Sequence, residues 1–162
     1  MLRIIDIMHD TTVDGPGFRT SIYCAGCRHA CPGCHNPQSW SFDAGRDMSE
    51  EEVLDIVLSD PFAHVTFTGG DPFYQAEGFA RLARMIKERS NKNIWAYTGF
   101  LFEQLLDSPL LAEIDGLVDG PFIMAQRDTE LVFRGSANQR IIDVPSSLKA
   151  GHVVEYQLDL SV

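Results

Sequence analysis

The four cysteines of this chain lie within eleven residues, in the stretch CAGCRHACPGC that runs from Cys24 to Cys34. The stretch FRTSIY before it, from Phe18 to Tyr23, is rich in strand-forming residues, so we expect a strand to run directly into the cysteine loop. A loop that gathers several thiols at one place constrains the fold around it more than any other feature of this sequence.

Two ligand sets are possible, because the spacing reads C-x2-C-x3-C-x2-C: all four cysteines, or only Cys27, Cys31 and Cys34. Structural zinc sites usually separate their two cysteine pairs by a longer insert, whereas only three residues intervene here, which disfavours zinc. A compact run of this kind suits an iron–sulfur cube. With four cysteine ligands such a cluster is closed and only passes electrons; with three, one iron is open to a substrate.

Cys24 is expected to end the preceding strand rather than to bind metal. It continues the alternation of Phe18 to Tyr23, and free cysteine is among the residues most often buried in a protein core. This interpretation leaves three cysteines for the cluster.

Strand and helix patterns alternate along the chain. Besides Phe18 to Tyr23, strands are predicted at the N-terminus and over residues 64–68, 93–99, 116–120, 139–144 and 152–158. Helices are predicted over 49–60, where Ser49 is a suitable N-cap, over 75–89 and, shorter, over 102–106. This order predicts one α/β domain over residues 1–162 with a mainly parallel sheet, whose ligands sit at the C-terminal ends of the strands.

The charge of the chain excludes some classes of partner. Thirteen basic and twenty-three acidic residues give a net charge of −10, which works against binding to nucleic acid or to anionic lipid. There is no long apolar run, and the stretch MLRIIDIMHD at the N-terminus does not have the layout of a signal peptide. We therefore expect a cytoplasmic protein without a membrane partner, whose clustered cysteines bind metal rather than form disulfides.

A second motif, TGGDP, spans Thr68 to Pro72 directly after a predicted strand. One reading is a helix start, with Asp71 as N-cap and Pro72 at the first helical position. The other is a binding turn, in which the missing side chains of Gly69 and Gly70 let a small ligand approach the backbone carbonyls. The motif alone favours neither reading.

Together, a C-x3-C-x2-C loop after one strand and a Gly-Gly-acid-Pro turn after the next resemble the radical S-adenosylmethionine (SAM) superfamily. The stretches DGPGFRT (14–20), CPGCHNPQSW (31–40), LVDGPF (117–122) and FRGSANQRIIDV (133–144) narrow the resemblance. They are similar to the glycyl-radical activating enzymes, and within these to the activating proteins of anaerobic ribonucleoside-triphosphate reductase.

The resemblance implies a fold and a reaction. The fold is a partial, open (βα)6-type barrel of about six strands. Cys27, Cys31 and Cys34 would hold a 4Fe-4S cluster whose fourth iron binds the amino and carboxylate groups of SAM. An electron from a low-potential donor would cleave SAM to methionine and a 5′-deoxyadenosyl radical, which takes a hydrogen atom from a backbone glycine of the reductase. No catalytic residue is implied beyond the cluster and SAM.

The resemblance also implies contacts with SAM. The methionine moiety would lie against Gly69, Gly70 and Asp71, and the adenine near Gly33 and His35. At position 35 many members of the family carry tyrosine, and an exposed loop histidine is the alternative reading of His35. Further candidates are Asp119, as a ribose or methionine contact or as a turn former, and then Tyr97, Asn138 and Arg140. Arg19 would dock the partner's glycine loop or pair with an acid.

Two other functions stay open on the sequence. One is a different short radical SAM enzyme, for example one similar to 7-carboxy-7-deazaguanine synthase. The other is a non-enzymatic iron–sulfur or zinc module that uses all four cysteines.

Overall fold

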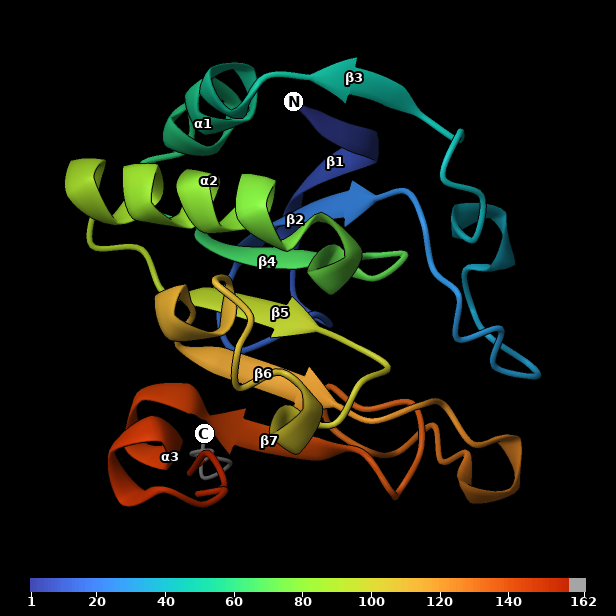
Figure 1. Cartoon of the computed structure of the whole chain (residues 1–162). Helices are drawn as coiled ribbons and strands as arrows, with labels where there is room; N and C mark the ends of the chain where they lie inside the picture. The colour runs from blue at the N-terminus through green and yellow to red at the C-terminus, as the bar shows by residue number, and fades with distance from the viewer. Residues whose placement is uncertain (158–162) are drawn as a thin grey trace.

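The computed structural model describes residues 1–157, and seven strands of this part form one sheet in the order β3-β1-β2-β4-β5-β6-β7. The central strands β2 (Arg19–Cys24), β4 (His64–Gly69), β5 (Ile94–Tyr97) and β6 (Gly116–Asp119) are parallel to one another. The outer strands β1 (Leu2–Thr11), β3 (Arg46–Met48) and β7 (Arg140–Asp143) are antiparallel to their neighbours. The arrowheads of the four central strands therefore point to one edge, where the loops after β2 and β6 leave the sheet (Figure 1).

Three α-helices accompany the sheet: α1 (Glu50–Leu58), α2 (Ala76–Arg89) and α3 (Val144–Ala150). The Ser49 side chain accepts a hydrogen bond from the Glu52 N–H and caps α1, as predicted. Short 3-10 turns lie between the longer elements: η1 (Pro37–Ser39), η2 (Pro72–Gln75), η3 (Phe102–Gln104), η4 (Leu111–Glu113) and η5 (Met124–Gln126).

The two faces of the sheet carry different side chains because neighbouring strand residues point to opposite sides. On one face Ile22, Phe67 and Ala96 join the main apolar core with residues of α1 and α2. The rings of Phe67 and Phe79 meet there at a centroid distance of 4.7 Å and tie β4 to α2. On the other face Trp95 and Val118 form a smaller cluster. The helices thus close one face of the sheet, and the smaller cluster lies on the other.

The α/β class and the open sheet are confirmed, but the set of strands and some directions differ from the expectation. Within residues 1–157 the sheet includes the short edge strand β3, which was not predicted, and the outer pairs are antiparallel. The helix predicted over 102–106 is the single turn η3. Residues 152–157 form only an isolated bridge, between Glu155 and Ile142, and Leu158 lies outside the described residues. Within residues 1–157 no helix has the length and apolar character needed to cross a membrane.

Candidate metal and cofactor site

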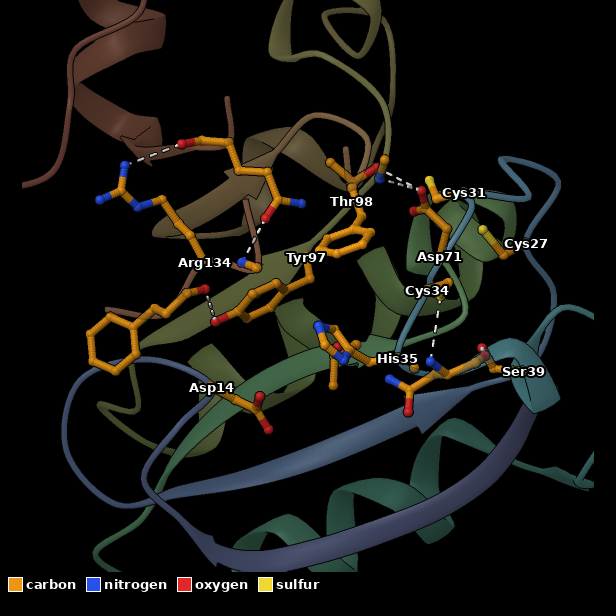
Figure 2. Close-up of a pocket in the computed structure, with 18 of the residues that line it drawn as sticks. Asp14, Cys27, Cys31, Cys34, His35, Ser39, Asp71, Tyr97, Thr98 and Arg134 are labelled. Carbon is orange, nitrogen blue, oxygen red and sulfur yellow. Dashed lines mark hydrogen bonds between the residues drawn. The ribbon is translucent and has the colours of Figure 1, made fainter. Parts of the chain in front are cut away.

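A cavity of about 640 Å³ lies at the edge where the parallel strands end. This volume falls within the range of about 300–1,000 Å³ that is usual for small-molecule sites. Figure 2 shows Cys27, Cys31 and Cys34 on one side of it, opposite Tyr97 and Arg134. The structure brings the following predicted site residues to its wall: Cys27, Cys31, Cys34, His35, Gly69, Gly70, Asp71 and Tyr97.

The cysteine loop is closed at its base by backbone hydrogen bonds. The N–H groups of Gly26 and Cys27 donate to the carbonyls of Ser39 (2.7 Å) and Trp40 (3.2 Å). Within the loop, the Cys34 N–H donates to the Cys31 carbonyl at 3.0 Å across Pro32 and Gly33. Proline and a glycine with φ of +77° suit the two central positions of this turn. The closed loop therefore presents its thiols to the cavity from a defined backbone.

The thiols fit an iron–sulfur cluster. Burial raises the pKa of Cys27 to about 11, so this thiol keeps its proton unless a metal cation replaces it. The Asn36 N–H donates to Cys34 Sγ at 3.4 Å. In residues 1–157 no three His, Cys, Asp or Glu side chains converge closely enough to share a single ion. Three thiols that serve separate irons of one cluster match this spacing better than a tetrahedral zinc site.

A buried donor without an acceptor also lies at this site. Trp40 lines the cavity, and its indole Nε1 has no hydrogen-bond partner within the described residues. Buried polar groups are almost always paired, so this donor is consistent with a site that gains an acceptor when it is loaded.

Cys24 ends β2, as predicted, and its side chain is completely buried in the core that α1 and α2 cover. Burial raises the pKa of its thiol well above the ordinary value, which disfavours the thiolate that a metal needs. Cys24 is not among the cavity-lining residues. That Cys24 does not bind metal stays a prediction, now supported by its place in the core.

Gly69 and Gly70 line the cavity, but the reason for glycine at these positions is the packing of the turn on β2. At Gly69, φ is +103° and a Cβ would lie 2.5 Å from the Cys24 backbone nitrogen. At Gly70 a Cβ would lie 2.6 Å from the Gly26 carbonyl oxygen. The absent side chains thus let the turn approach the base of the cysteine loop, and that they also admit a ligand to the backbone, one of the two readings of the motif, stays a prediction.

Asp71 caps the turn that leads into α2, as one of the two readings predicted: its Oδ1 accepts from the Phe73 N–H at 3.0 Å. Its Oδ2 accepts from His29 Nε2 (2.7 Å), the Thr98 hydroxyl (2.7 Å) and the Gly99 N–H (3.0 Å). The carboxylate is buried and accepts four hydrogen bonds, three at Oδ2 and one at Oδ1. Its side chain therefore holds protein segments together, and that it also contacts the methionine moiety of SAM stays a prediction.

Of the two residues predicted to contact the adenine, His35 lines the cavity and Gly33 does not. His35 is an exposed residue on the cavity wall, and its ring meets Phe122 edge to face at 5.2 Å. Gly33 is not a lining residue, and a Cβ there would collide with the side chain of Met124. A flat ring beside the third cysteine is thus in place, while Gly33 serves the turn and the packing of the loop after β6.

Asp119 is correctly placed at the end of a strand but is turned away from the cavity wall. It is fully buried, and its carboxylate accepts from Arg140 and from the Phe102 N–H at 2.8 Å. Arg140 also binds Glu103, and these partners raise its pKa. Asn138 stabilises the loop after β6 by donating from its side-chain amide to the Pro121 carbonyl. The sequence could not distinguish these internal partners from a ligand contact.

Arg19 forms no ion pair with an acidic side chain of residues 1–157, and that it docks a partner's glycine loop stays a prediction. It is completely buried, donates to Thr66 Oγ1 and to the Pro16, Val65 and Asn93 carbonyls, and lies over the Trp95 ring. Burial lowers its pKa to about 10, so it still carries its charge at neutral pH. Its observed function is to hold the loop before β2 against β4 and β5.

The sequence reading missed several residues of the site. Asp14, quoted above only as part of the stretch DGPGFRT, lines the cavity and accepts from Ser21 Oγ (2.9 Å) and the Tyr23 hydroxyl (3.1 Å). Burial and this carboxylate raise the pKa of Tyr23 to about 12, so the phenol stays a donor. His29 was visible only as a histidine between two cysteines. The wall formed by residues 131–135 overlaps the stretch FRGSANQRIIDV, but its place at the cavity involves a tertiary contact from the Tyr97 hydroxyl to the Phe133 carbonyl.

The chain matches a known domain family and a set of characterised relatives. Residues 13–142 match the family model described as "4Fe-4S single cluster domain". The chain is 37% identical over 139 residues to the anaerobic ribonucleoside-triphosphate reductase-activating protein of Haemophilus influenzae, covering 80% of this chain and 90% of that protein. Proteins of the same name from Vibrio cholerae and Escherichia coli are 39% and 31% identical and cover 80% and 78% of this chain, and 90% and 89% of theirs.

A comparison of structures gives a likeness of fold. The crystal structure of QueE from Escherichia coli aligns with a TM-score of 0.50 and 17% sequence identity, over 60% of this chain. The aligned part spans about half of that protein, 52% of its length. At this identity the likeness supports the α/β architecture and says nothing of substrate.

Proposed function

Because the chain belongs to the family of anaerobic ribonucleoside-triphosphate reductase-activating proteins, which carry the 4Fe-4S single cluster domain, we propose that it activates such a reductase. The activation uses a 4Fe-4S cluster and SAM and leaves a radical on a backbone glycine of the reductase. The observation that carries this proposal is the meeting of three thiols of a C-x3-C-x2-C loop with a Gly-Gly-Asp turn on one cavity wall. Residues 1–162 form a single catalytic domain in this proposal.

When bound, the cluster and SAM supply a one-electron cleavage of the sulfonium to methionine and a carbon radical that takes the glycine hydrogen. Cys27, Cys31 and Cys34 hold the irons as thiolates, and the backbone of Gly69 and Gly70 borders the place for the methionine moiety. His35 offers a ring to the adenine. We assign no general base, because radical transfer depends on placement and on exclusion of water.

The walls of the cavity suit that task. Phe122, Phe133 and Tyr97 border it with rings, and the Tyr97 hydroxyl is engaged with the Phe133 carbonyl at 2.7 Å. Burial raises the pKa of Tyr97, so the phenol stays neutral. Aromatic C–H bonds are stronger than aliphatic ones, so the rings of Phe122 and Phe133 compete little with the glycine for a carbon radical. The electron for each turnover comes from a low-potential donor outside this chain.

Cleavage of SAM by the isolated protein is the first test. Protein reconstituted with iron and sulfide without oxygen, and then reduced with dithionite, is expected to form 5′-deoxyadenosine and methionine in equal amounts, measured by liquid chromatography. Unreduced protein is the matched control and is expected to form neither. A preparation with a complete reduced cluster that yields no 5′-deoxyadenosine contradicts the proposal.

A further inference from the structure

His29 is the one residue between the first two cluster cysteines whose side chain is turned into the protein. Its side chain is 16% exposed, although both neighbours, Arg28 and Ala30, are exposed. The ring lies edge to face with Phe100 at 4.5 Å and tilted against Tyr74 at 5.6 Å. The side chain thus anchors the middle of the loop to a part of the fold distant in sequence.

The anchor is a hydrogen bond. His29 Nε2 lies 2.7 Å from Asp71 Oδ2, and since a carboxylate only accepts, the imidazole carries a proton on Nε2. The same carboxylate accepts from the Phe73 N–H at the start of η2 and from the Thr98 hydroxyl and the Gly99 N–H directly after β5. One buried group therefore joins the cysteine loop, the Gly-Gly-Asp turn and the end of a central strand.

The neighbouring backbone is shaped for this anchor. A Cβ at Gly99 would lie 2.5 Å from His29 Cδ2, so the ring occupies the space that glycine leaves. Ala30 has φ of +49°, a left-handed conformation that costs energy in any residue with a Cβ. This turn of the chain lies between His29 and Cys31. Some contact must hold the loop in this strained shape. The hydrogen bond from His29 to Asp71 is adjacent to Ala30 and can do so.

We infer that His29 is a positioning residue: its Nε2–H bond to Asp71 sets the curvature of the loop that carries Cys27 and Cys31, and so the retention of the cluster and the place of SAM beside it. Asp71 takes part through His29 and the turn rather than as a ligand of SAM. This inference rests on the proposed function, since it assumes that the three cysteines hold the cluster.

Two substitutions separate the hydrogen bond from simple packing. His29→Gln keeps an N–H donor at a similar distance from the backbone, whereas His29→Met fills the space without a donor. Iron release from the anaerobically reconstituted protein to a chelator is expected to be about 10–100-fold faster in His29→Met, as for other residues that orient metal ligands. His29→Gln is expected to stay much closer to wild type. His152→Met, at an exposed histidine outside the site, is the matched control and should not change the rate.

A spectroscopic reading shows whether the loop positions SAM as well. The electron paramagnetic resonance signal of the reduced wild-type cluster is expected to shift when SAM is added, and this shift is expected to be lost or altered in His29→Met and restored in His29→Gln. Gly99→Ala displaces the ring from outside the loop and should reproduce the His29→Met effects. Because both changes break the same bond, the double variant should be no worse than either single one.

The outcomes separate the two proposals. If wild-type protein forms a cluster and His29→Met releases iron at the wild-type rate with an unchanged SAM shift, the inference is wrong while the proposed function stands. The same holds if His29→Gln behaves as His29→Met does, because packing then explains the effect. If wild-type protein itself shows no cluster, the proposed function fails first. Where His29→Met does not fold, Gly99→Ala decides on the same readings.

Discussion

Replacing Cys31 with serine is expected to abolish the formation of 5′-deoxyadenosine, whereas replacing Cys24 with alanine is expected to leave it intact. Changes to residues that merely orient a metal ligand already cost about 10–100-fold, so loss of a ligand should cost more than about 100-fold. Cys31 lines the cavity, and Cys24 lies in the apolar core between β2 and the helices. The two cysteines are only seven positions apart, yet the fold gives them opposite surroundings.

Iron content and product are measured together on both variants. Alanine removes the Cys24 thiol without placing a hydroxyl in the core, so the variant should keep its cluster with a modest loss of stability. If Cys24→Ala loses iron and activity as Cys31→Ser does, the site has four protein ligands. The hypothesis of a closed iron–sulfur or zinc module would then replace the proposed function.

The second large effect is expected at Gly69. Alanine there faces two costs: a left-handed φ of +103° and a Cβ placed 2.5 Å from the Cys24 nitrogen and 2.7 Å from its carbonyl oxygen. The first costs about 1–2 kcal/mol and the second, as overpacking against backbone, about 1–3 kcal/mol. Urea unfolding of the apoprotein should therefore show a loss of about 2–5 kcal/mol. Because the clash lies between β4 and the base of the cysteine loop, cluster retention should fall too.

Gly151 offers a matched control at the end of α3. Its φ is +78°, and a Cβ there would meet nothing within 4 Å, so Gly151→Ala carries only the backbone cost of about 1–2 kcal/mol. The difference between the two variants isolates the clash of the Gly-Gly turn with β2. Equal losses in both variants, with the cluster retained at Gly69→Ala, would mean that the turn does not depend on this close approach.

Local signals in the sequence were sufficient to predict much of this fold. The strand that ends at Cys24, the capped helix after Ser49 and the Asp71 cap are all set by neighbours in sequence, and each is observed. Two motifs that follow parallel strands were expected at one edge, and they share a cavity wall. Edge strand β3 was missed, since three residues with two charges carry no periodic pattern.

The partners of polar side chains could not be predicted, because they come from distant parts of the chain. Asp119 meets Arg140 and the η3 backbone, and Asp71 meets His29 and the end of β5. From sequence both aspartates were candidate ligand contacts. In the fold both carboxylates accept hydrogen bonds from distant parts of the chain, and whether either also contacts a ligand stays a prediction. The glycines likewise were correctly located, but their close packing on the backbone of Cys24 and Gly26 could not be read from the sequence.

The central claim is that this chain places a radical on a glycine of an anaerobic ribonucleoside-triphosphate reductase, and one spectrum tests it directly. The reductase is incubated without oxygen with reconstituted wild-type protein, SAM and a reductant, and its electron paramagnetic resonance spectrum is recorded. The account predicts a glycyl-radical doublet in the complete mixture, absent without SAM and absent with Cys31→Ser. A mixture that forms 5′-deoxyadenosine but leaves the reductase without that doublet would contradict it.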